Sequence, residues 1–154
     1  LKLLLKYGGD VNAEAKPKKG IVQQLKTPLI AAANSSIENV KILVEADADI
    51  NYVNAQFQSP IYEACNFDKI EIIRYLIIDK KAKIDIPLIK VLETNDTLYL
   101  HNILRNLRFE IGSKDHEMKM EVVEYLKERG MNYWETPIPK RFYDLYPKEY
   151  LEKY

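Results

Sequence analysis

Two stretches of the chain, 32 to 34 residues apart, have nearly the same sequence, and this repeat constrains the fold most. The first begins at Thr27-Pro28-Leu29 and the second at Ser59-Pro60-Ile61. Each continues with apolar residues and ends in a similar segment, "ADIN" in the first copy and "AKID" in the second. A short period of this kind is typical of solenoids, whose units cannot bury a core alone and must stack.

Each copy predicts two short helices. Thr27 and Ser59 suit the N-cap position, where a hydroxyl accepts a free backbone N–H, and the proline that follows suits the first helical position. Asp68, with Glu71 three residues later, predicts a capping box for the second helix of the second copy. The second helices carry apolar residues along one face, namely Ile37, Val40, Leu43 and Val44, then Ile70, Ile73, Leu76 and Ile77.

The segments "TPLIAAA" and "ADADIN" resemble the ankyrin-repeat pattern Thr-Pro-Leu-His-x-Ala-Ala followed by Gly-Ala-Asp-Val-Asn. "LKLLLKYGGDVNA" resembles the second half of an earlier unit, and "MKMEVVEYLKERGMNY" resembles the second helix of a later one. The resemblance covers residues 1–86 and is weaker over 87–133. The chain departs from the pattern at Ile30 and Tyr62 in place of histidine, Glu63 in place of leucine, and Phe57 in place of a hairpin glycine.

This resemblance implies an all-α solenoid of about four stacked helix-turn-helix units in a single domain, 1–154. We divide it into a half-unit with a long basic hairpin (1–26), two units (27–58 and 59–86), irregular units (87–133) and an aromatic C-terminal cap (134–154).

Two interpretations stay open for the segment from residue 87 to 133. One is a further helix pair in which Asp96 caps the second helix. In this interpretation the helix at residues 118–129 requires a partner helix of its own. The other is one unit with an inserted helix. We prefer four units with an irregular fourth. The tyrosines of the cap either cover the end of the stack or form a docking surface, since Tyr and Trp are common binding anchors.

Composition excludes several functional classes. The chain has 23 basic and 23 acidic residues and a net charge of zero, which argues against nucleic acid or an anionic membrane as partner. Its one cysteine, Cys65, excludes an internal disulfide and favours a reducing, cytoplasmic compartment. No apolar run approaches the roughly 18 residues that a membrane span requires.

The sequence carries no catalytic or metal-binding signature. Cys65 aligns with Ala33 of the preceding copy, a small core position, and no histidine or acid lies at a diagnostic spacing from it. We interpret His101 as a packed or partly exposed histidine and His116 as a solvated one, and the five glycines form no phosphate loop. We therefore expect no enzymatic activity, no cofactor and no metal.

The resemblance further implies a concave binding face built from hairpin tips and first helices. Carried over by position, this face comprises Gln23, Gln24, Lys26, Val53, Gln56, Phe57 and Gln58, with Asn34, Ser35, Asn66 and Phe67 at the ends of the first helices. The long hairpin adds Lys16, Lys18 and Lys19, either as a solvated loop or as a contact for an acidic partner.

These observations favour a module that binds a protein partner of unknown identity, with a structural spacer or a capping segment of a larger multidomain protein as the alternative. We expect a monomer. The leucine-rich half-unit at the N-terminus lacks a first helix, so its apolar side is expected to pair with another copy or to fray. Residues upstream of Leu1 would then raise the melting temperature.

Overall fold

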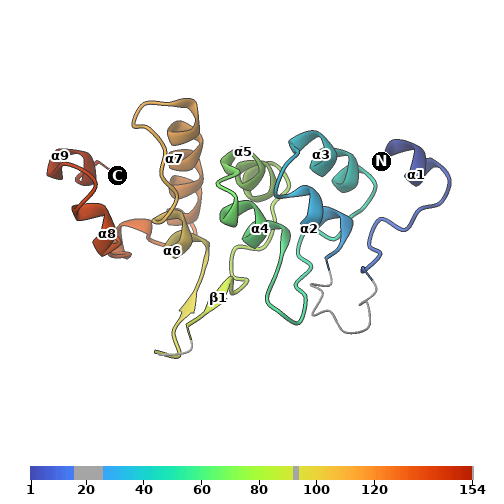
Figure 1. Ribbon diagram of the computed structural model, residues 1–154, viewed down its shortest axis with the longest axis horizontal. Coiled ribbons are helices and arrows are strands. Elements are labelled where there is room, and N and C mark those ends of the chain that lie inside the picture. Colours follow the sequence, from blue (N-terminus) through green and yellow to red (C-terminus); the bar gives the residue numbers. More distant parts are fainter. Residues whose placement is uncertain (16–25, 92–93, 154) are drawn as a thin grey trace.

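Short antiparallel helix pairs stack side by side in the computed structural model, which describes residues 1–15, 26–91 and 94–153 (Figure 1). The helices are α1 (Lys2–Lys6), α2 (Pro28–Ala32), α3 (Ile37–Glu45), α4 (Pro60–Asn66), α5 (Ile70–Arg74), α6 (Leu100–Leu104), α7 (Lys114–Lys127), α8 (Lys140–Tyr143) and α9 (Lys148–Leu151). A π-helical turn, Tyr75–Asp79, continues α5, and a 3-10 turn, Tyr133–Glu135, follows α7. Two short strands are β1 (Ile89–Lys90) and β2 (Thr97–Leu98).

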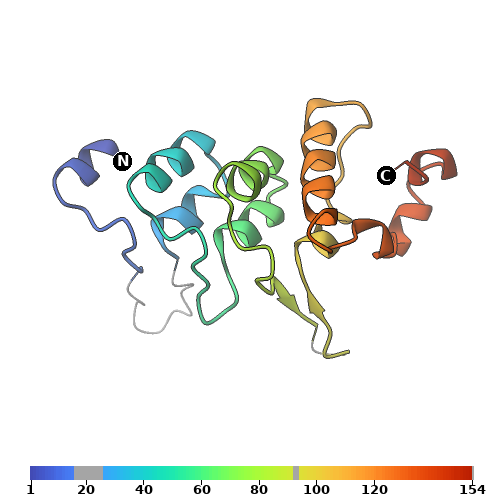
Figure 2. The same ribbon diagram turned by 180° about the vertical axis from the view of Figure 1, so that it is seen from behind.

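The helix pairs form two layers. First helices α2, α4 and α6 lie in one layer and second helices α3, α5 and α7 lie in the other, while the loops between units project beyond the first helices (Figures 1 and 2). At the N-terminal end α1 has none of its residues buried. The predicted all-α solenoid is confirmed, with one small two-stranded sheet added to it.

The predicted helix caps are partly confirmed. Thr27 Oγ1 accepts a hydrogen bond from the backbone N–H of Ile30 (3.4 Å), and Ser59 Oγ accepts one from Tyr62 (3.1 Å). The capping box at Asp68 is wrong, because α5 follows Lys69 without a side-chain cap. Asp68 instead has a positive φ of 52°, so it forms the left-handed turn between the two helices.

The chain reverses after each second helix through a left-handed residue. This residue is Gly8, Asp47, Lys81 and Gly130 in the four described turns, with φ between 57° and 84°. Glycine adopts this conformation without strain, and an αL residue beyond the last helical turn is a common way to end a helix. The recurrence of one turn at four places fixes the register of the stack.

Asparagine side chains join the first three of these turns. Asn12 Oδ1 accepts from the backbone N–H of Asp49 (2.9 Å), and Asn51 Oδ1 accepts from that of Lys83 (2.8 Å). These two asparagines occupy equivalent positions in successive units. Their side chains therefore tie neighbouring turns together at a fixed spacing.

The segment after residue 86 corrects the predicted helix pair. Ile89 pairs with Leu98 and Lys90 with Thr97 in an antiparallel hairpin, so Asp96 lies beside a turn and caps no helix. The partner of α7 is α6, and the extra length of this region forms a long hairpin in place of an inserted helix. A physical reason is that the turn residue Asn95 adopts a φ of 59°, which reverses the chain between two short apolar runs.

One continuous apolar cluster runs from α2 to the turn after α7 and includes Ala33, Cys65 and Tyr133. A second, small cluster contains Phe142 and Leu151 of α8 and α9, with Tyr146 and Tyr150 packed against it. The Tyr150 hydroxyl donates to the backbone carbonyl of Phe109 (2.9 Å), which ties this second cluster to the loop after α6. The large aromatics of the C-terminal segment therefore divide between packed rings and exposed ones such as Tyr143.

The end of the stack contains a fully buried lysine. Lys119 of α7 donates to the carbonyl of Leu107 (3.0 Å), and its Nζ lies 5.1 Å from the centroid of the Tyr133 ring. The Arg105 guanidinium lies 4.4 Å from the centroid of the same ring. Burial, and secondarily the charge of Arg105, lower the pKa of Lys119 from 10.5 to about 7.

Gly130→Ala is expected to lower the free energy of unfolding by about 1–2 kcal/mol, because an L-residue is strained in the left-handed region. A Cβ at Gly130 meets no atom within 4 Å, so the loss is conformational. Urea unfolding measures it. Gly130→Asn is the matched control, since asparagine tolerates this conformation better; equal losses in the two variants would contradict the explanation.

Replacing Lys119 by methionine should change how stability depends on pH. Between the folded pKa of about 7 and the ordinary value of 10.5, only the unfolded chain holds the proton, so wild-type stability rises with pH. The unfolding free energy of Lys119→Met relative to wild type should therefore fall over this window, by up to about 1.4 kcal/mol per pH unit. Urea unfolding at several pH values checks this, with exposed Lys127→Met as control. A difference independent of pH would refute it.

Candidate partner-binding surface

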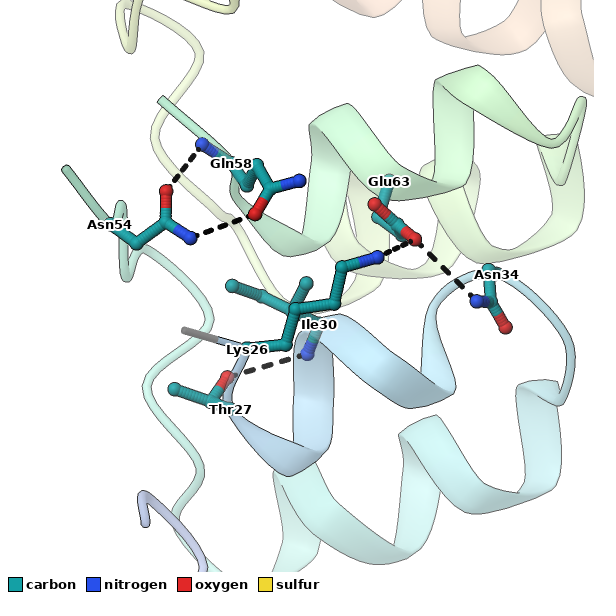
Figure 3. A network of polar contacts seen from close by, with 7 residues as sticks. All are labelled: Lys26, Thr27, Ile30, Asn34, Asn54, Gln58 and Glu63. Atoms are coloured by element: carbon teal, nitrogen blue, oxygen red, sulfur yellow. Dashed lines mark hydrogen bonds and ion pairs between the residues drawn. The ribbon is translucent and has the colours of Figure 1, made fainter. Parts of the chain in front are cut away.

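A single asparagine organises the loop of residues 52–58, which connects two successive units. Asn54 Oδ1 accepts hydrogen bonds from the backbone N–H groups of Gln56 (3.0 Å) and Gln58 (2.9 Å). Asn54 Nδ2 donates to Gln58 Oε1 (2.9 Å), and both side chains are buried (Figure 3). Gln58 was predicted to face a partner, but its buried amide is used to hold the loop together.

The loop presents Phe57 to solvent in a strained conformation. Its φ is 60°, and 50% of its surface is exposed. The backbone N–H of Phe57 donates to the carbonyl of Asn54 (3.0 Å), which fixes the left-handed turn. This conformation costs an L-residue roughly 1–2 kcal/mol, and glycine is the residue that the family usually places here. The loop therefore retains an aromatic ring at a position where glycine would avoid the left-handed strain.

Phe57 forms one wall of a surface pocket of about 280 Å³. We call it the Phe57 pocket, and it is lined by Gln56, Phe57, Tyr62, Leu88, Ile89 and Lys90. Its walls come from three elements, the 52–58 loop, helix α4 and strand β1. Tyr62, Leu88, Ile89 and Lys90 were missed from sequence, because residues 87–133 were interpreted as helical units and Tyr62 was noted only as a departure from the histidine of the pattern.

A polar network lies between the first two complete units (Figure 3). Lys26 Nζ lies 2.5 Å from Glu63 Oε1, and Asn34 Nδ2 donates to the same oxygen at 3.5 Å. Glu63 of α4 is only 2% exposed. Lys26 and Asn34, both predicted to contact a partner, are thus used to neutralise a buried carboxylate that stands where the family has leucine.

The remaining predicted residues do not form one continuous site. Ser35 lines a separate depression beside the turns between helices, together with Asp68. Asn66 and Phe67 are exposed at the end of α4, and Val53 is half-buried in the loop. The structure brings together only Gln56 and Phe57 in one pocket. The predicted residues Lys16, Lys18, Lys19, Gln23 and Gln24 lie outside the described residues.

The hairpin preceding α2 contributes one further contact to this side of the molecule. The Tyr52 hydroxyl donates to the carboxylate of Glu14. This hydrogen bond raises the pKa of the Tyr52 hydroxyl, with burial and the charge of Glu14 as smaller causes. Glu14 and Tyr52 therefore link the first two hairpins.

Cys65 and the two histidines are at least partly buried. Cys65 is buried, and burial raises the pKa of its thiol well above the ordinary value, which disfavours the reactive thiolate. Burial is also the main cause that lowers the pKa of His101 and of His116. The residues that the structure describes contain no group of three or more His, Cys, Asp and Glu side chains able to hold a metal ion.

The family profile described as ankyrin repeats (3 copies) matches residues 1–88. The chain belongs to the ankyrin-repeat family. Ankyrin repeats are generally protein–protein interaction modules and are typically non-catalytic. No match to a curated protein was found. Within the described part of this ankyrin-repeat protein, no helix has the length and apolar character needed to cross a membrane.

Lys26→Met is expected to destabilise the domain by about 1–3 kcal/mol, because it leaves the Glu63 carboxylate buried with Asn34 as its remaining polar contact. The double variant Lys26→Met/Glu63→Leu should recover most of this loss, since a buried ion pair can often be replaced by apolar residues. Urea unfolding of both variants measures the difference. A double variant as unstable as the single one would show that Glu63 is not the cause.

Proposed function

We propose that this domain binds a protein partner through the side formed by its interunit loops, with Phe57 as the principal anchor. The single observation that supports this is the half-exposed Phe57 ring, held in a left-handed conformation beside an apolar pocket. Aromatic residues surrounded by polar side chains are typical of binding hot spots. Gln56 supplies such a polar neighbour in the same pocket.

The loop is suited to binding because it is ordered before a partner arrives. Asn54 makes three side-chain hydrogen bonds to Gln56 and Gln58, so little conformational freedom remains to be lost. A surface of this kind binds with a smaller entropic penalty than a flexible loop. We also propose Lys16, Lys18 and Lys19 as partner contacts, and we propose neither nucleic acid nor a membrane as a partner.

Two substitutions at one position test this function. Phe57→Ala should weaken partner binding by more than about 1 kcal/mol, because it removes the anchor ring, while it lowers stability by less. Phe57→Gly should weaken binding similarly but raise the unfolding free energy by about 1 kcal/mol, because the left-handed strain is relieved. Calorimetric titration with a partner recovered from the native host measures binding, and urea unfolding measures stability.

The control is Tyr143→Ala, which removes another exposed aromatic side chain on α8 far along the stack (Figure 1). It should leave binding unchanged. A partner that binds Phe57→Ala as tightly as wild type would contradict the proposed anchor. Recovery of no specific partner by the wild-type domain would favour a structural spacer.

A further inference from the structure

The Phe57 pocket is a small surface depression that is open to solvent. At about 280 Å³ it lies just below the range of roughly 300–1,000 Å³ that is usual for small-molecule sites. Such a pocket accommodates one large side chain and is small for a nucleotide or another cofactor. Buried Leu88 and half-buried Ile89 and Tyr62 present mainly apolar surface to it. An aromatic or long aliphatic side chain is therefore its chemically matched occupant.

The pocket is held open by two supports. On one side, the hydrogen bonds of Asn54 and the left-handed backbone of Phe57 fix the position of the ring. On the other side, Ile89 and Lys90 pair with Leu98 and Thr97 across the β-hairpin. Because both walls belong to hydrogen-bonded turns, a side chain entering between them meets a preformed site.

The residues that line the pocket carry charge of one sign only. Lys90 is the one ionisable group among its lining residues that carries a charge at neutral pH, and it is exposed. Lys90 forms no ion pair within the described parts of the chain, whereas Lys26 is already paired with Glu63. A carboxylate placed next to an apolar anchor would therefore meet a cation at the rim, and a second cation there would be repelled.

We propose that the Phe57 pocket binds a partner segment in which one large apolar residue is flanked by acidic residues. The apolar side chain fills the space between Phe57 and Ile89, and a neighbouring carboxylate pairs with Lys90. This inference rests on the proposed protein-binding function and adds the chemistry of the partner to it. The partner segment belongs to a separate protein.

Short peptides of defined sequence test the inference directly. The probe is acetyl-Asp-Glu-Trp-Glu-Asp-amide, titrated into the whole ¹⁵N-labelled chain while backbone amide shifts are followed. Two comparison peptides replace Trp by alanine or all four acids by lysine. We expect a dissociation constant of about 1 mM for the probe, because a single pocket supplies little interaction energy. Both comparison peptides should bind about tenfold more weakly. The largest shifts should occur at Gln56, Phe57, Ile89 and Lys90.

Charge reversal at the rim changes an exposed side chain, so we expect the variant to keep the fold. Lys90→Glu should weaken the acidic probe about tenfold and strengthen the lysine peptide. Lys140→Glu, an exposed lysine on α8, should change neither. Equal binding of acidic and basic peptides, or probe affinity unchanged in Lys90→Glu, would overturn the inference. Amide shifts at Gln56, Phe57, Ile89 and Lys90 that depend on protein concentration without peptide would show that a second copy occupies the pocket, which would also overturn it.

The recovered partner separates this inference from the proposed function. If partner binding requires Phe57 but is unchanged in Lys90→Glu, the proposed function stands and the acidic segment is wrong. If partner binding is unchanged in Phe57→Ala as well, both proposals fail. Loss of binding in both variants supports the two together.

Discussion

The helix pairs α2/α3, α4/α5 and α6/α7 bury their apolar faces in one shared cluster, so each of these units depends on its neighbours. Residues such as Val40, Leu76 and Val122 on successive second helices are fully buried in one continuous cluster. The left-handed turn after each second helix sets the spacing that this packing requires, and the asparagine contacts between turns keep it. The helices therefore form the core that stabilises the domain, and the loops between units tolerate changes in sequence and length.

The two informative departures from the ankyrin pattern have opposite effects. Glu63 replaces a buried leucine and draws Lys26 and Asn34 into an internal network, so residues that the family uses at its binding face serve the core here. Phe57 replaces a glycine and projects apolar surface outward at the cost of backbone strain. A substitution at a consensus position therefore indicated a local change in structure. Only the contacts in the structure distinguish a change in the core from a change at the surface.

Much of the fold could be predicted from the sequence, because threonine or serine before proline marks the first helices and the tail of each unit marks the turns. The hairpin at residues 89–98 could not be predicted, because short apolar runs fit a helix or a strand equally well. Packing against the neighbouring helices determines which of the two forms. The buried position of Lys119 could not be predicted either, because a lysine on a helix usually lies in solvent. At the candidate site, Phe57 was identified because it departs from the glycine of the ankyrin pattern. The pocket wall formed by β1 was missed because the hairpin at residues 89–98 was not predicted.

The strain at Phe57 bears on whether this domain binds a partner or only spaces its neighbours. A spacer has no use for an exposed ring, and glycine at the same position would relieve the left-handed strain. Asn54 and Gln58 bury polar groups and satisfy them with one another to hold that loop in place. A costly conformation that surrounding residues stabilise is most often found at functional sites. The physical balance at this loop therefore favours a binding surface over a spacer.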